Sequence, residues 1–131
     1  MPRVLISRHI LTRLAPHDGL TKALKSFIEA CSAGRQPPRI YKPSGIAADG
    51  SEYLPYLRLD LHHHHLHRRG DPLLITQNID EDIYGIGLAR HADYFHGDRM
   101  LWLQQHAHMI DWTGCEDLRE LVLAHDPQKE F

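Results

Sequence analysis

Long apolar runs, targeting signals and abundant cysteine are all missing from this 131-residue chain. No stretch of about 18 apolar residues is present, so a membrane-spanning helix is not expected. The first residues, Met1 to Ile6, lead into a strand-like run without the apolar segment of a signal peptide. The two cysteines, Cys31 and Cys115, lie far apart and fit the free thiols of a reducing compartment. We therefore expect a single cytoplasmic domain that covers residues 1–131.

Motifs of several enzyme classes are missing as well. The chain holds no Cys-x-x-Cys pair, no His-Glu-x-x-His motif, no phosphate-binding loop and no Ser/His/Asp pattern. Strong charge of either sign is also absent, since 15 Lys and Arg stand against 17 Asp and Glu, a formal net charge of -2. Wholesale electrostatic binding to nucleic acid is therefore not indicated, and a polyanion would need a local patch or protonated histidines.

Histidine, in contrast, is abundant, with 12 residues in the chain. In residues 57–69 an alternating, strand-like segment runs into five histidines and two arginines. Without a bulge, His63 and His65 follow the leucine face of this strand, while His62 and His64 follow its polar face. Because an unperturbed imidazole titrates near neutral pH, such a strand end is suited to proton transfer or metal binding. We expect at least one of these histidines to be functional.

The apolar spacing of the first 52 residues predicts a strand, a helix and a loop. Alternation in residues 3–14 predicts the strand. Residues 20–31 carry the apolar stripe of an amphipathic helix, which Gly34 should end. Residues 35–52 contain several glycines and prolines among few apolar residues, and we expect them to form a loop.

Three strands are expected next, at about residues 53–65, 72–78 and 83–91. Because short turns separate them, they should form an antiparallel meander. The third strand would carry Gly85 and Gly87 on one face. A face without side chains is either covered by something packed very close or left open as the floor of a groove.

Two helices complete the expected fold. One should run from Asp98 to about Asp111, and the capping-box spacing of Thr113 and Glu116 predicts that a short helix begins there. The order of elements is therefore that of a small α+β fold, in which an antiparallel sheet packs with helices.

A second polar cluster follows the third expected strand. Loops at strand ends commonly carry chemistry. Its groups suit acid/base cleavage of RNA: a base takes the 2′-hydroxyl proton, an acid protonates the leaving 5′ oxygen, and arginines stabilise the charge on the phosphate. As an alternative, it is a polar loop in which Asp98 caps the next helix. The cluster holds Arg90, His91, Asp93, Tyr94, His96, Asp98 and Arg99.

Most of the chain is covered by several short motifs, each of which occurs once and in a fixed order. They are the opening Arg3-Val4 strand, the helix that ends in Phe27-Ile28, the segment Leu54-Pro55-Tyr56-Leu57-Arg58 leading to His63-x-His65-Leu66, the strand Leu73 to Gln77, the strand Ile86 to Leu88 with His91 after it, and the helix around Met100 to Ala107. In this order and spacing the chain resembles the YafO family of toxins from bacterial type II toxin–antitoxin systems, within the wider RelE/ParE fold.

The resemblance implies a RelE-like α+β fold and an endoribonuclease that cuts mRNA on the ribosome without a metal or other cofactor. It implies three partners, which are a cognate antitoxin, the ribosome and mRNA. Toxins of this kind are usually basic, whereas this chain has a net charge of -2. The implied catalytic residues are His63, His65, His91, Asp93, Tyr94 and His96. The implied RNA-binding residues are Arg58, Arg68, Arg69, Arg90 and Arg99.

Two other functions stay open. A toxin on the same fold could bind a target such as gyrase without catalysis, since a fold does not decide function. Alternatively, residues 62–67 could hold zinc together with His91 or His96 in a metal-binding module or hydrolase. The remaining histidines are expected to be poor ligands or surface residues: His106, His108, His9, His17 and His125.

Overall fold

The computed structural model describes residues 3–14, 18–35, 41–43, 58–66, 72–90 and 99–125. The α+β class is confirmed, because helices and strands follow one another in both halves of the chain. In order, the elements are β1 (Val4–Ile6), α1 (Arg8–Leu14), α2 (Asp18–Ser32), β2 (Tyr41–Pro43), β3 (Leu61–His65), β4 (Leu73–Ile79), β5 (Asp82–Ala89), α5 (Arg99–Gln105), the 3-10 helix η1 (Ala107–Met109) and α6 (Glu116–Ala124).

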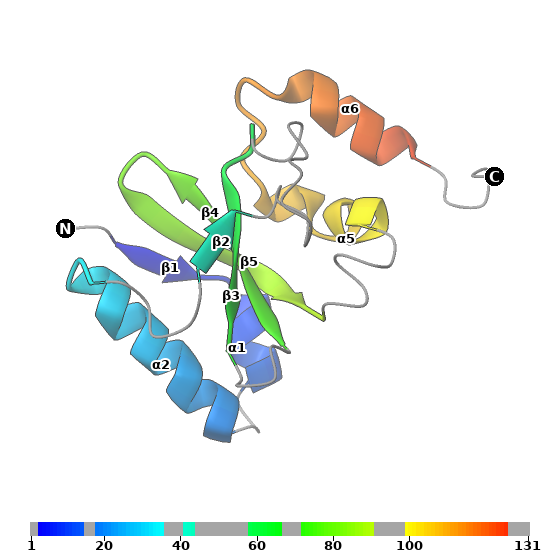
Figure 1. Ribbon diagram of the computed structural model, residues 1–131. Coiled ribbons are helices and arrows are strands. Elements are labelled where there is room, and N and C mark those ends of the chain that lie inside the picture. The colour runs from blue at the N-terminus through cyan, green and yellow to red at the C-terminus, as the bar shows by residue number, and fades with distance from the viewer. Residues whose placement is uncertain are drawn as a thin grey trace.

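The five strands of the described part form one sheet in the order β1-β5-β4-β3-β2 (Figure 1). The predicted meander is confirmed, since β3, β4 and β5 pair antiparallel. The prediction of a wholly antiparallel sheet was wrong, because β1 lies parallel to β5, with Val4 opposite Ile83. After β1 the chain crosses to the far edge of the sheet. Strand direction then reverses at each step from β2 to β5, and β5 returns to β1 in the same direction.

The first 43 residues differ from the predicted pattern in two places. The strand expected over residues 3–14 ends at Ile6, and α1 begins at Arg8. Between them, the Ser7 hydroxyl accepts a hydrogen bond from the Ile10 N–H at 3.4 Å, the role of a helix N-cap. The predicted loop contains the short edge strand β2, which ends at Pro43, a residue without a backbone donor.

Helices pack on both faces of the sheet, so α2 and α6 lie on opposite sides of it (Figure 1). On one face, α5, η1 and α6 cover the sheet, with Trp102, Leu103, Ala107, Ile110, Leu118 and Val122 packed against Leu61, Leu73, Ile75, Ile86 and Ala89. On the other face, α1 and α2 place Ile10, Leu24, Phe27 and Cys31 against Leu66, Leu74 and Leu88.

An irregular pairing at Ile86 changes which residues of β5 face each helix layer. Ile75 pairs with Gly87, but the next residue, Thr76, pairs with Gly85, so Ile86 is an extra residue in the ladder, as in a β-bulge. The two glycines therefore face different helix layers, and the prediction of one glycine face was wrong. Both are covered closely: a Cβ at Gly85 would lie 2.8 Å from Ile6, and one at Gly87 would lie 2.7 Å from the His106 ring.

The helix ends follow local sequence signals to different degrees. Gly34, at a φ of 72°, ends α2 as predicted: its N–H donates to Cys31 and the Arg35 N–H donates to Ala30, the pattern of a Schellman motif. The predicted capping box at Thr113 was wrong. The N-cap of α6 is Cys115, and the Glu116 carboxylate accepts from the Gly114 N–H at 3.2 Å.

Gln77 joins three separate segments through a side chain that is only 3% exposed. Its amide nitrogen donates to the carbonyl oxygens of Leu59 and Asp111, each at 2.9 Å. Its amide oxygen accepts from the Asp111 N–H at 2.8 Å. This one side chain therefore holds the turn before β3 and the segment before α6 to β4.

Replacing Gln77 with methionine should lower the free energy of unfolding by about 2 kcal/mol, because the buried Leu59 carbonyl and two partly buried backbone groups of Asp111 lose their partner. Urea unfolding measures the loss. The matched control is Gln105→Met on the exposed face of α5, which should change the unfolding free energy by less than about 0.5 kcal/mol. Equal effects of the two substitutions would contradict the role given to Gln77.

Candidate functional site

The four histidines of β3 alternate between the two faces of the sheet. His62, His63 and His64 are 8%, 4% and 1% exposed, and His65 is half-buried. His64 packs edge-on against Phe27 of α2, with ring centroids 4.4 Å apart. His63 and His65 share the other face, where their ring centroids are 5.8 Å apart. Because Leu61 also faces that side, the predicted grouping of these two histidines with the leucines is confirmed.

His64 is a neutral core residue. Its Nε2 lies 3.1 Å from the Thr76 hydroxyl, within the pair of strands β3 and β4. Burial lowers the pKa of His64 to about 3, and the neighbouring His62, His63 and His65 add to the effect. An imidazole with such a low pKa does not carry a proton near neutral pH. His64 therefore stabilises the fold and is not the proton-transfer group that the sequence pattern predicts for this strand.

His62 is tied to the turn that starts β3. Its Nε2 lies 2.6 Å from the carboxylate of Asp60, a residue with a φ of 52°. The left-handed conformation of Asp60 turns the chain sharply before the strand. The contact therefore fixes the beginning of β3 and, with it, the face on which each following histidine lies.

The register of the meander brings the end of β3 to the end of β5. His65 pairs with Leu73, and Leu73 pairs with Ala89, the last residue of β5. Residues paired in this way lie on the same face. Since adjacent strands are about 4.8 Å apart, the backbones of His65 and Ala89 are separated by roughly 10 Å. On this face the side chain of Leu73, which is 0% exposed, fills the space between them. A site shared by the two strands would therefore lie beyond their ends.

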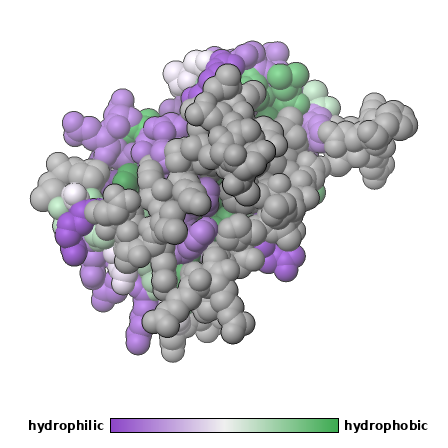
Figure 2. Space-filling model, in the orientation of Figure 1, coloured by the Kyte–Doolittle hydropathy of each residue, from purple (hydrophilic) through white to green (hydrophobic). Residues whose placement is uncertain are grey.

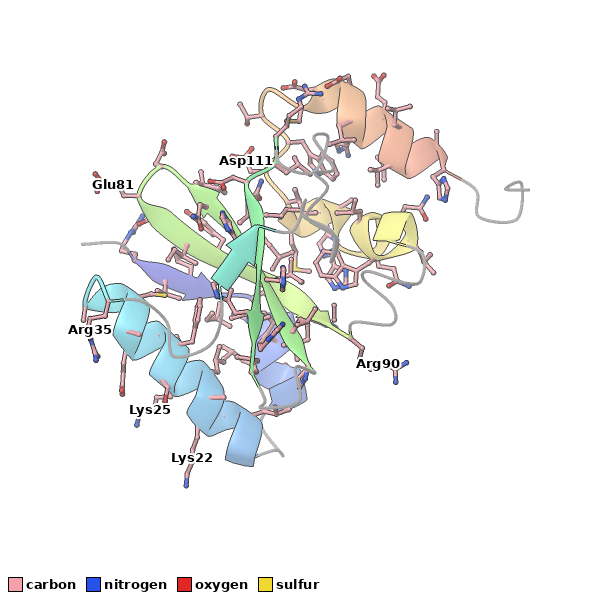
Figure 3. All side chains as sticks on the ribbon, in the orientation of Figure 1. Lys22, Lys25, Arg35, Glu81, Arg90 and Asp111 are labelled. Atoms are coloured by element: carbon pink, nitrogen blue, oxygen red, sulfur yellow. The ribbon has the colours of Figure 1, made fainter. Side chains whose placement is uncertain are left out.

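Arg90 follows directly after β5, and its side chain is exposed and points away from the sheet (Figure 3). It is therefore on the same end of the sheet as His65. Arg99 begins α5. The other members predicted for this site lie outside the described residues, and their roles stay predictions: His91, Asp93, Tyr94, His96, Arg68 and Arg69.

Arg58 lies away from this end of the sheet, in an ion pair with α6. Its guanidinium donates to both carboxylate oxygens of Asp117, each at 3.1 Å, and to the carbonyl of Gly114 at 3.1 Å. These hydrogen bonds hold the pKa of Asp117 below its usual range. Binding of a phosphate by Arg58, as the sequence predicts, would have to replace this exposed pair, and the role stays a prediction.

A second pair of histidines was not expected from the sequence. His106 is 8% exposed and stacks on Trp102, with ring centroids 4.0 Å apart and planes 14° apart. The ring of His9, on α1, meets the His106 ring edge-on, and the two ring centroids are 6.0 Å apart. The Trp102 carbonyl lies 2.8 Å from Nδ1 of His106 and can only accept, so it fixes the proton of the neutral ring on Nδ1.

The close approach of His106 depends on Gly87, whose missing side chain leaves room for the ring. The spacing of Trp102 in α5 and His106, four residues later and directly after the helix, is the signal that could have indicated the contact. The same tryptophan donates from its indole nitrogen to the Leu88 carbonyl at 3.2 Å. Only three residues of β5 pair with β1, and Trp102 covers part of the β5 backbone beyond that pairing.

Two further observations concern metal binding and membrane-spanning helices. Among the described residues, no group of three or more His, Cys, Asp or Glu side chains is arranged to hold a metal ion. None of the described helices is long and apolar enough to cross a membrane.

Comparison of the chain with protein-family models, with curated proteins and with solved structures found no match.

The low pKa of His64 predicts that acid destabilises the fold. In the unfolded chain the His64 imidazole binds a proton near pH 6.5, but in the folded chain only near pH 3. The contribution of His64 to the free energy of unfolding is therefore fully present above about pH 6.5 and decreases as the pH falls below that value. The slope should approach about 1.4 kcal/mol per pH unit for this group. Between about pH 7.5 and pH 5, His64→Gln should therefore lose about 2 kcal/mol less than the unchanged protein in urea unfolding.

The exposed His108 provides the control for this experiment, because its side chain meets water in both the folded and unfolded chain. His108→Gln should leave the dependence of stability on pH as it is in the unchanged protein. If His64→Gln and His108→Gln gave the same dependence, the buried neutral state of His64 would be refuted.

Proposed function

We propose that the protein is the toxin of a bacterial type II toxin–antitoxin system, with a RelE-like fold, and that it cleaves mRNA on the ribosome. The fold supports this through its order of elements: a first strand, two helices, and a meander whose last strand pairs with the first. The observation that carries the proposal is the register of the meander. It brings His65 to the end of β5, after which the second polar cluster of the sequence begins.

The proposed chemistry is proton transfer without a metal. One histidine takes the proton of the 2′-hydroxyl, which then attacks the adjacent phosphorus, and a second donates a proton to the leaving 5′ oxygen. The products are a 2′,3′-cyclic phosphate and a free 5′-hydroxyl. We assign these roles to His65 and His91, without deciding which is the base. Arg90 and Tyr94 would contact the phosphate and orient it.

Of the two histidines that share one face of β3, His65 is the better candidate to contact RNA. It is half-buried, whereas His63 is 4% exposed. His63 lies beside it, with ring centroids 5.8 Å apart, and would act as a positioning residue. A cognate antitoxin would cover this end of the sheet or the helices, because helices already pack on both faces of the sheet.

Primer extension on a defined mRNA, with purified protein and with or without ribosomes, tests the proposal. New 5′ ends that need ribosomes support it. Ends that form equally well without ribosomes would indicate a free ribonuclease. If growth of the producing cells stops while the mRNA stays intact, the protein would instead be a toxin that binds its target without catalysis.

His65→Gln should lower ribosome-dependent cleavage by at least about 100-fold, because a proton-transfer group contributes about that much or more. The exposed His108 gives the matched control, and His108→Gln should cleave at the rate of the unchanged protein. Circular dichroism and urea unfolding must show that both variants are folded. Full cleavage by folded His65→Gln would remove His65 from the mechanism.

A further inference from the structure

The small net charge hides a strong separation of charge along the chain. Residues 1–48 hold eight Lys and Arg against two Asp and Glu, a net charge of +6. Residues 49–131 hold seven against 15, a net charge of -8. Such an asymmetry between two parts of one chain is a signal for binding to a polyanion, even where the total charge is near zero.

Among the described side chains, Arg3 of the basic part pairs with Asp82 at 2.7 Å, and the other cations of that part lie on or directly after the first two helices. The basic part forms α1 and α2, which cover one face of the sheet. Arg8, Lys22, Lys25 and Arg35 are exposed there, and Glu29 is the one acid among the side chains described on these two helices. In Figure 3, Lys22, Lys25 and Arg35 extend from α2 away from the sheet. Figure 2 shows hydrophilic residues along the same lower-left outline.

The acidic residues gather elsewhere. Asp80 and Glu81 form the turn between β4 and β5, and Glu116 and Glu120 are exposed on α6. Figure 1 places α6 across the sheet from α2. The surface over α6 also includes an apolar area (Figure 2), and Leu121 of this helix is 64% exposed. Among the described side chains, cations therefore prevail on α1 and α2 and acids on α6 and the turn between β4 and β5, so the α2 side suits a polyanion.

Three cations of this side are arranged along α2. Lys22 and Lys25 are one helical turn apart and lie on one side of the helix. The Schellman motif holds the backbone of Arg35 directly after the helix, through the hydrogen bond from its N–H to Ala30 at 2.8 Å. At 1.5 Å per residue, α2 extends about 15 Å from Lys22 to its end at Ser32, and Arg35 follows that end. A stacked nucleic-acid strand carries roughly four phosphates over that length.

We propose that the surface formed by Lys22, Lys25 and Arg35, the basic α2 surface, binds the sugar-phosphate backbone of RNA. It lies over the sheet face opposite to His65 and is therefore not the place of the scissile phosphate. It anchors the protein on a second stretch of RNA, which a nuclease that works only on the ribosome requires. This inference deepens the proposed function, and it rests on that function in naming RNA as the polyanion.

Binding of a labelled RNA of about 20 nucleotides, followed by fluorescence anisotropy from about 50 to 300 mM KCl, tests the surface. All riboses are 2′-O-methylated, so the probe lacks the attacking hydroxyl and cannot be cleaved. Each lost contact to a single strand reduces the slope of log K against log salt by about 0.7. The triple variant Lys22→Gln, Lys25→Gln, Arg35→Gln should therefore lose about 2 from the slope and about 100-fold in affinity at 0.1 M salt.

Arg119 is the matched control, since it is an exposed cation on a helix of the acidic side. Lys25→Gln should weaken binding about 5-fold at 0.1 M salt, whereas Arg119→Gln, with the same loss of charge, should change it less than 2-fold. Equal losses in these two variants would overturn the proposal, because they would show only an effect of net charge. Unchanged binding by the triple variant would overturn it as well.

The uncleavable probe separates this inference from the proposed catalysis. If the triple variant loses binding but no form of the protein cleaves mRNA, the basic α2 surface stands and the nuclease fails. If the protein cleaves on ribosomes but does not bind the probe, the surface fails and the nuclease stands. Sedimentation of the protein alone supplies the remaining outcome: self-association that the triple variant abolishes, without RNA binding, would assign the surface to a second copy and overturn the proposal.

Discussion

The pairing register of β3, β4 and β5 is the constraint on which the other features depend. Because side chains alternate along a strand, a shift of one residue would move His63 and His65 to the face of α2 and bring His64 to the other side. The observed register is held at the start of β3 by the hydrogen bond from the Asn78 N–H to the Asp60 carbonyl at 3.2 Å and within the sheet by the contact of His64 with Thr76. Polar contacts thus specify the arrangement, while apolar packing on both faces stabilises it.

Much of the fold could be predicted because its signals are local. The apolar stripe of residues 20–31 and the glycine after it indicate α2 and its end, and short turns indicate the meander. Three features could not be predicted in this way. The bulge at Ile86 and the edge strand β2 depend on pairing with distant strands, and the N-cap role of Ser7 was hidden by the alternation around it. Long-range pairing overrides local pattern in these places.

In the candidate site, too, the features that depend on local sequence pattern could be predicted, whereas those that depend on distant contacts could not. Alternation correctly separated His63 and His65 from His62 and His64, but it could not show that His64 is fully buried and neutral. That outcome depends on α2, which brings Phe27 against the ring. The approach of His9 to His106 likewise depends on α1 and on the residue that follows α5, which meet beside Gly87 of β5. The convergence of His65 with the end of β5 follows from the register and brings His65 near Ala89, which comes shortly before the second polar cluster in the sequence.

The decisive measurement is an experimental structure of the protein on a ribosome with uncleavable mRNA. We expect the scissile phosphate between His65 and the residues that follow Ala89, beyond the ends of β3 and β5. A second stretch of RNA should lie along Lys22, Lys25 and Arg35. A scissile phosphate bound anywhere else on the protein, with His65 outside hydrogen-bond distance of it, would refute the proposed site.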